Sequence, residues 1–108
     1  MKKRFQNQRL LTAGVNQRIQ PALQLLMWFM IEEVPEADYL QIFELDVEIT
    51  EGVVQMIHKQ EQPECEQIIF WMISNTKGFF DNIEKWSGKK LYVIDDGIAI
   101  TTLFPYER

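Results

Sequence analysis

The sequence predicts an α+β fold, in which an antiparallel sheet of four or five strands carries one long apolar helix and a short second helix. Two observations predict the sheet: side chains alternate around a Glu-Gly step at 51–52, and apolar runs flank an Asp-Gly step at 96–97. The third observation is an apolar run that begins at Pro21 and predicts the helix. A length of 108 residues suits a single domain over 1–108, and disorder remains open for the basic arm 1–8.

The first two elements are a short strand and the helix. The segment 9–15 has the composition of a strand that ends near Gly14. Pro21 suits a first helical turn and Pro35 stops a helix, which predicts one over 21–34. This helix is apolar on nearly all sides, so it is either deeply buried or presents one face to a partner. Its apolar residues are Leu23, Leu25, Leu26, Met27, Trp28, Phe29, Met30 and Ile31.

The segment 39–60 predicts a β-hairpin. With Glu51 and Gly52 as a two-residue turn, in which the glycine supplies a positive φ, the numbers of facing residues sum to 103. This register places His58 on the apolar face, opposite Leu45. The rest of that face is Phe43, Val47, Ile49, Val54 and Met56. The other face is acidic and carries Glu44, Asp46 and Glu48, with Gln55 and Lys59 across from them.

The remaining elements alternate between strand and helix. The run 67–73 is continuously apolar, which is typical of a central strand covered on both faces. A capping aspartate and a closing glycine predict a short helix over 79–88. Two further strands are predicted over 90–95 and 98–104.

The adjacent carboxylates of Asp95 and Asp96 allow two interpretations, a metal or acid–base site and the bend of a hairpin. Asp-Gly is among the most favourable two-residue hairpin loops. With Asp96 and Gly97 at its centre, facing residues sum to 193, and both faces of the hairpin are then largely apolar, so the short helix near 82–87 or another chain must cover the second face. The segment also lacks the spacing of a calcium-binding loop. The sequence therefore favours a turn, with both carboxylates solvated at the sheet edge.

Charge is distributed unevenly along the chain. The net charge is −5, and residues 32–66 carry eleven acids against Lys59 alone. This segment is either a solvated acidic surface or a patch for a basic partner. Direct nucleic-acid binding is disfavoured because such affinity comes from Lys and Arg on phosphates. The candidate partner-binding residues are Glu32, Glu33, Glu36, Asp38, Glu44, Asp46 and Glu48.

Side chains that could carry catalysis are scarce. His58 is the only histidine, and as a general base it would need an oriented nucleophile, whereas both serines fall in predicted loops. Cys65 lies between two glutamates, which suppress its thiolate. No phosphate-binding loop, dinucleotide fingerprint or zinc pattern occurs, so we predict no catalytic residue, metal or cofactor. A single cysteine and apolar runs too short for a spanning helix favour a cytoplasmic protein without membrane contact.

Several stretches together resemble a known family: "TAGVNQRIQPALQLLMWFMIEE", "DYLQIFELD", "MIHKQEQPE" and "LYVIDDG". They resemble a small family of low-GC Gram-positive bacteria and their mobile elements, catalogued as domain of unknown function 960. The resemblance covers residues 9–66 and 90–103, and the sequence departs from it over 67–89 and after 104. It implies a small cytoplasmic α+β protein and supplies no site, since the family has no established activity.

Three functional hypotheses follow. The first is a non-enzymatic acidic interaction protein, in its most specific form a mobile-element-borne inhibitor that occupies a basic nucleic-acid-handling protein, in the manner of an anti-CRISPR. The second is a homodimeric structural or regulatory module whose exposed apolar surface binds. The third, a remote alternative, is a hydrolase using His58. A salt-sensitive heteromeric complex distinguishes the first, and self-association distinguishes the second.

Overall fold

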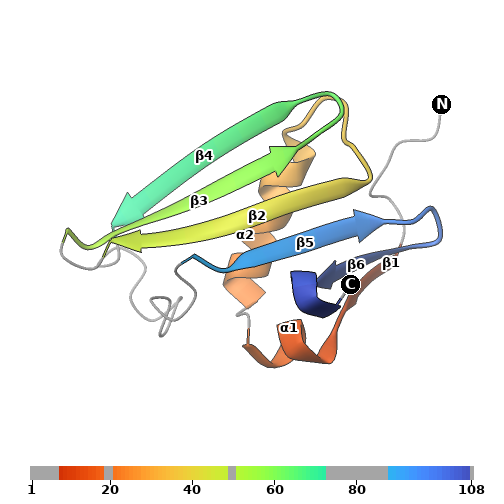
Figure 1. The fold of residues 1–108 in the computed structure, drawn as a ribbon, viewed down its shortest axis with the longest axis horizontal. Helices are drawn as coiled ribbons and strands as arrows, with labels where there is room; N and C mark the ends of the chain where they lie inside the picture. Colours follow the sequence, from red (N-terminus) through yellow and green to blue (C-terminus); the bar gives the residue numbers. More distant parts are fainter. Residues whose placement is uncertain (1–7, 19–20, 49–50, 73–87, 108) are drawn as a thin grey trace.

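The computed structural model describes residues 8–18, 21–48, 51–72 and 88–107, which form a six-stranded sheet with helices on its edges and one face (Figure 1). In chain order the elements are β1 (Gln8–Leu11), α1 (Ala13–Arg18), α2 (Pro21–Glu32), β2 (Leu40–Glu48), β3 (Val53–Gln60), β4 (Cys65–Met72), β5 (Lys90–Asp95), β6 (Ala99–Leu103) and the 3-10 helix η3 (Pro105–Glu107). The strands lie side by side in the order β1-β6-β5-β2-β3-β4.

This architecture corrects the predicted fold class. The sheet has six strands rather than four or five, and it is mixed rather than antiparallel because β1 runs parallel to β6. Helix is confined, among the described residues, to short elements, of which α1 has six residues and α2 has twelve. The sheet therefore dominates. The prediction of one long apolar helix over 21–34 is wrong, because this segment forms only the twelve-residue α2, which ends at Glu32. The short helix predicted over 79–88 lies outside the described residues, apart from Gly88.

Helix α1 replaces the end of the strand predicted over 9–15. The N–H of Thr12 donates to the carbonyl of Thr102 at 3.1 Å, which continues the pairing of β1 with β6 by one residue. The hydroxyl of Thr12 then accepts the N–H of Val15 at 3.2 Å, and its carbonyl accepts the N–H of Asn16 at 2.9 Å. Thr12 is thus an N-cap that ends the strand and starts the helix within one residue.

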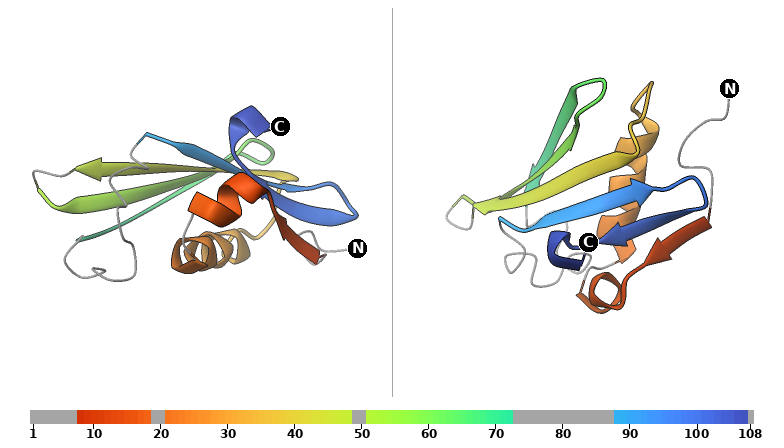
Figure 2. Two further views of the ribbon diagram at one scale, coloured as in Figure 1. Left: turned by 90° about the horizontal axis from the view of Figure 1, so that it is seen from below. Right: turned by 45° about the vertical axis from the view of Figure 1, so that its right-hand side comes forward.

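Helix α2 covers one face of the sheet, as Figure 2 shows, and no other described helix lies over β2, β3 and β4 on the opposite face, which we call the open face. Its buried side chains recur at three- and four-residue spacing and enter the core: Leu23, Met27, Met30 and Ile31. On its outer side Leu25 and Phe29 remain 54% and 58% exposed. The helix is therefore not buried all round, and its composition reflects a core stripe plus an exposed apolar pair.

The β2–β3 hairpin has the predicted faces in a different register. Phe43 faces His58 and Leu45 faces Met56, so facing residues sum to 101 instead of 103. The connection is longer than the predicted two-residue turn, although Gly52 does take a positive φ of 69°. A slip of two residues leaves every side chain on its own face, because side chains alternate with period two. The apolar face packs on α2 and the acidic face is open.

The register of the β5–β6 hairpin also differs from the predicted one by two in the sum of facing residue numbers. Val93 faces Thr102, and the N–H of Asp96 donates to the carbonyl of Ala99 at 3.2 Å, so facing residues sum to 195. The central pair of the turn is thus Gly97 and its successor, and Gly97 has a φ of 92°. A glycine at the first central position satisfies the positive φ that hairpin turns of this length require there.

Strand β4 lies at the edge of the sheet, so the central strand predicted over 67–73 is wrong. Its side chains alternate between half-buried and exposed along its whole length. The exposed row is Glu66, Ile68, Phe70 and Met72. A continuous apolar run is ambiguous between a strand covered on both faces and an edge strand with one apolar face in solvent.

Candidate functional site

The open face of the sheet gathers three of the seven predicted binding residues in one line. Glu44, Asp46 and Glu48 occupy alternate positions on β2, so their side chains lie on the same face at intervals of roughly 7 Å. Asp46 and Glu48 are exposed and Glu44 is half-buried. We call these three residues the acidic row.

The strands that flank the acidic row compensate little of its charge. Across from Glu44 lie Ile57 on β3 and Lys90 on β5. Asp46 faces Gln55, and Glu48 faces Val53, so neither has a cation opposite it on β3. The other lysine of this face, Lys59, forms an ion pair with Glu66 at 3.8 Å. The acidic row therefore presents a local excess of negative charge.

The other four predicted binding residues lie elsewhere. Glu32 and Glu33 are at the end of α2, on the covered side of the sheet, and both are exposed. Glu32 forms an ion pair with Arg9 at 3.7 Å, and the guanidinium of Arg9 lies 3.7 Å from the ring centroid of Trp28. This arrangement ties β1 to α2, which is a structural use of Glu32.

Glu36 and Asp38 belong to the connection between α2 and β2. The carboxylate of Asp38 accepts the N–H of Tyr39 at 2.8 Å and the N–H of Gln62 at 3.1 Å. It therefore holds the start of β2 against the β3–β4 turn. The side chain of Glu36 is exposed, and its carbonyl accepts the side-chain amide of Gln60 at 2.9 Å. The structure thus separates these four residues from the acidic row.

His58 is the centre of a buried chain of amide hydrogen bonds on the covered face. Its side chain is 2% exposed, and its ring stacks on Phe43 with a centroid distance of 4.4 Å. Its Nδ1 lies 3.1 Å from the amide nitrogen of Gln67, and its Nε2 lies 2.5 Å from the amide oxygen of Gln41. These contacts assign a neutral ring that accepts at Nδ1 and donates from Nε2–H.

The hydrogen-bond chain continues beyond the ring on both sides. The amide of Gln41 donates to the amide oxygen of Gln60 at 2.8 Å and to the carbonyl of Asp38 at 2.9 Å. Gln60 in turn donates to the carbonyls of Glu36 and Pro63. At the other end, Gln67 donates to the carbonyl of Met30 in α2 at 2.9 Å. Each of these amide donors meets an acceptor, and the network joins β2, β3, β4 and α2.

This environment opposes a catalytic use of His58. Burial lowers the pKa of His58 from 6.5 to about 4, since the charged ring is poorly solvated there. Both ring nitrogens already bind glutamine amides, so neither is available for a substrate proton. His58 is buried because it lies opposite Phe43, and this face of the β2–β3 hairpin packs against α2.

Asp95 and Asp96 serve the β5–β6 turn. The carboxylate of Asp95 accepts the N–H of Gly97 at 2.9 Å, and that of Asp96 accepts the N–H groups of Ile98 and Ala99, both at 2.9 Å. The turn interpretation is therefore confirmed, although Asp95 is only 5% exposed rather than solvated. Aspartates that accept backbone N–H groups two or three residues ahead are typical turn formers.

The carboxylate of Asp96 is expected to titrate below its ordinary pKa of 3.8, because the N–H groups of Ala99 and Ile98 stabilise its charged form. A carbon-13 NMR titration of the carboxyl carbon measures this pKa. Asp96→Asn keeps an acceptor oxygen and is expected to preserve the hairpin, whereas Asp96→Ala is expected to lower the Tm. A measured pKa at or above 3.8 would contradict the hydrogen bonds that assign this turn.

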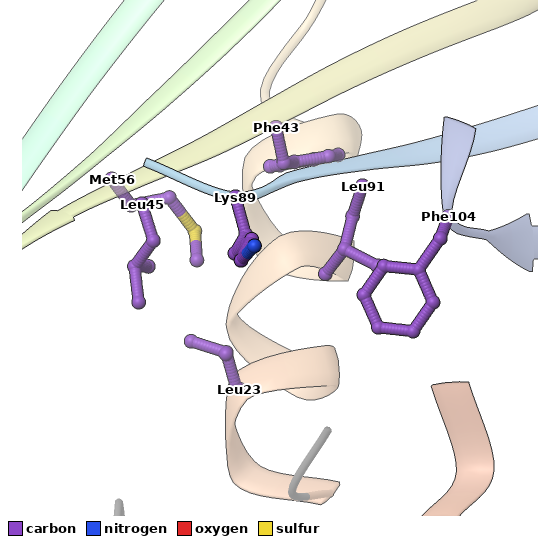
Figure 3. A pocket seen from close by; sticks show the side chains of 7 residues that line it. All are labelled: Leu23, Phe43, Leu45, Met56, Lys89, Leu91 and Phe104. Atoms are coloured by element: carbon purple, nitrogen blue, oxygen red, sulfur yellow. The ribbon is translucent and has the colours of Figure 1, made fainter. Parts of the chain in front are cut away.

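A small cavity lies between α2 and the covered face of the sheet (Figure 3). Its lining is apolar except for Lys89: Leu23, Phe43, Leu45, Met56, Leu91 and Phe104. Its volume of about 10 Å³ is at most the space of one water molecule. This cavity is a packing defect of the core and is too small for a ligand of its own.

Among the described residues, no group of three His, Cys, Asp or Glu side chains could hold a metal ion. Within the same part of the chain, no helix has the length and apolar character needed to cross a membrane.

Sequence reasoning missed the apolar part of the open face. Ile68, Phe70 and Met72 on β4 are 45%, 73% and 44% exposed, and they continue the face beyond β3. The segment 67–73 gave no signal for this, because from Ile68 to Met72 its half-buried and exposed positions are equally apolar. We call these three residues the β4 apolar row.

Comparison with known proteins places this fold. The family model described as Staphylococcal protein of unknown function (DUF960) matches residues 8–107. A crystal structure of a protein of unknown function from Enterococcus faecalis superposes with a TM-score of 0.76, at 23% sequence identity, over 100% of this chain and 98% of that chain. No curated protein matches the sequence. Because the family model covers almost the whole chain, this protein belongs to the DUF960 family.

Proposed function

We propose that this protein is a non-enzymatic interaction protein that binds a basic protein surface through the acidic row of its open face. The observation that carries the proposal is the line of Glu44, Asp46 and Glu48 along β2, with few cations opposite. The face is also broad, because β2 lies inside the sheet and β3 and β4 extend the surface beyond it. Such a surface complements the charge of a surface lined by Lys and Arg, and the electrostatic attraction between the two speeds their association.

In its specific form, the proposed partner is a protein that handles nucleic acid, such as a nuclease, in the cytoplasm. A row of carboxylates spaced by roughly 7 Å resembles a phosphate backbone in charge and repeat, so it can occupy a channel that holds nucleic acid. The protein would then act as an inhibitor, as a mobile element would use against host defence. The buried, neutral state of His58 supports a non-enzymatic role.

A charge-reversal experiment tests this function. The variant with Glu44, Asp46 and Glu48 all replaced by Lys is expected to lose at least a tenfold factor in affinity, because each contact pairs a carboxylate with a cation. The protein is immobilised, basic nucleases of the host are passed over it, and binding and nuclease inhibition are measured between about 0.05 and about 0.5 M NaCl. Wild-type binding is expected to weaken steadily with salt.

The matched control changes the same net charge elsewhere. Glu33, Glu61 and Glu64 are exposed and lie outside the acidic row, so their joint replacement by Lys should leave binding within a few-fold of wild type. Equal losses in both variants would show that only net charge matters. Unchanged binding and inhibition in the acidic-row variant would refute the proposal.

A further inference from the structure

We infer that β4 is a dimerisation edge, at which the β4 strands of two copies pair antiparallel across a two-fold axis to make one continuous sheet. This inference concerns a different surface from the acidic row and stands independently of the proposed partner.

The backbone of β4 has the regular extended geometry that pairing with another strand requires. Its pairing with β3 runs without interruption from Val53 opposite Met72 to Gln60 opposite Cys65, so the strand contains no bulge. Among the described residues no strand lies on its other side. A regular edge strand presents a row of N–H and C=O groups that only another extended chain can pair continuously.

Proteins that remain monomeric usually protect their edge strands with features that prevent such pairing. The common ones are a proline, a bulge, a charge in the middle of the strand or a very short length. β4 is eight residues long, and its one charged side chain, Glu66, is near the start. From position 67 to 72 the strand has no charged residue and no proline.

The side chains of the strand match a second copy of themselves. With Phe70 on the two-fold axis, Ile68 of one copy faces Met72 of the other, and facing residues sum to 140. The β4 apolar row thus meets an identical apolar row, and cross-strand aromatic and aliphatic pairs of this kind stabilise sheets. Glu66 then faces no acidic residue, so like charges do not oppose each other.

Symmetry favours this pairing over one that uses the opposite edge. The other edge strand, β1, has four residues and runs parallel to its neighbour β6. A contact between β4 and β1 of another copy would be heterologous and would leave open edges for further addition, whereas β4 with β4 closes after two copies.

The exposed area sets the expected strength. Phe70 is 73% exposed, so it contributes on the order of 150 Å² per copy, and Ile68 and Met72 add less. The side-chain area is then well below the roughly 1,200 Å² of a stable complex. The dimer is therefore expected to be weak, with a dissociation constant in the micromolar range or above.

Sedimentation velocity over a wide concentration range tests the dimer on the full chain. Wild type is expected to shift from monomer to dimer as concentration rises into the high micromolar range. Phe70→Glu places a charge at the centre of the contact and is expected to raise the dissociation constant at least tenfold. Phe29→Glu makes the same change at a side chain 58% exposed on α2, and it should dimerise as wild type does.

Cysteine cross-linking tests the register in a Cys65→Ser background. Phe70→Cys is expected to form a disulfide between two identical copies under mild oxidation, since these positions meet on the axis. Ile68→Cys should link to Met72→Cys in a mixture and should not link to itself. A strict monomer at high concentration, or a dimer that survives Phe70→Glu, would overturn the inference.

Discussion

Replacing Phe43 by alanine is expected to destabilise the protein by about 3–5 kcal/mol. Phe43 is 1% exposed on the covered face of β2, where its ring lies in the core and stacks on His58. The truncation removes this burial and leaves a cavity beside the one that already exists there. It also removes one wall of the histidine network, so the substitution is expected to fall at the upper end of this range.

Urea unfolding, followed by tryptophan fluorescence, measures this loss as a fall in the transition midpoint at an unchanged slope. Phe29→Ala is the matched control, because it makes the same chemical change at a side chain 58% exposed on α2. Its effect is expected within about 0.5 kcal/mol of zero. If the two variants lose stability equally, Phe43 is not part of a packed core.

The faces of the hairpins could be predicted from the sequence, and their registers could not. Apolar alternation on β2 and β3 decides which side chains point to α2, and the energy of burial makes that choice strong. Register depends on loop length, and a Glu-Gly or Asp-Gly step does not say where the turn is centred. Both hairpins differ from prediction by two in the sum of facing residues, a change that preserves every face.

The order of the strands in the sheet could not be predicted from the apolar pattern of the sequence. β1 joins β6 from the other end of the chain, and a four-residue strand gives no signal of its parallel partner. β4 was predicted to be central because residues 68–73 are all apolar, but its place at the edge is decided by pairing, among the described strands, with β3 alone. Without that order, the exposed side chains of β4 could not be recognised.

The acidic candidates show the same limit on a functional site. Their clustering along the sequence was visible, and three of them share a strand, so the acidic row could be predicted from alternation. The other four were grouped by proximity in sequence alone. The chain turns between α2 and β2, and this turn sends Glu32 to the covered side, where Arg9 binds it.

Acidification is expected to destabilise the protein through His58, by about 3 kcal/mol in full and about 2 kcal/mol between about pH 7 and about pH 5. The pKa of His58 is about 4 in the folded chain and 6.5 without burial, so the unfolded chain binds the proton first. Its contribution to stability is therefore complete above pH 6.5 and is lost as the pH falls from 6.5 through 4. His58 is the only histidine, so no other one contributes to this loss.

The comparison of wild type with His58→Gln isolates this contribution, because glutamine does not titrate and can still donate and accept hydrogen bonds. The variant is expected to be less stable at neutral pH, since it loses the stacking on Phe43 and fits the amide chain poorly. Its stability is nevertheless expected to change much less than that of wild type between about pH 7 and about pH 5. Urea unfolding at each pH gives both curves. Parallel curves would mean that protonated His58 is accommodated, which requires the amide of Gln67 to rotate and to release the carbonyl of Met30.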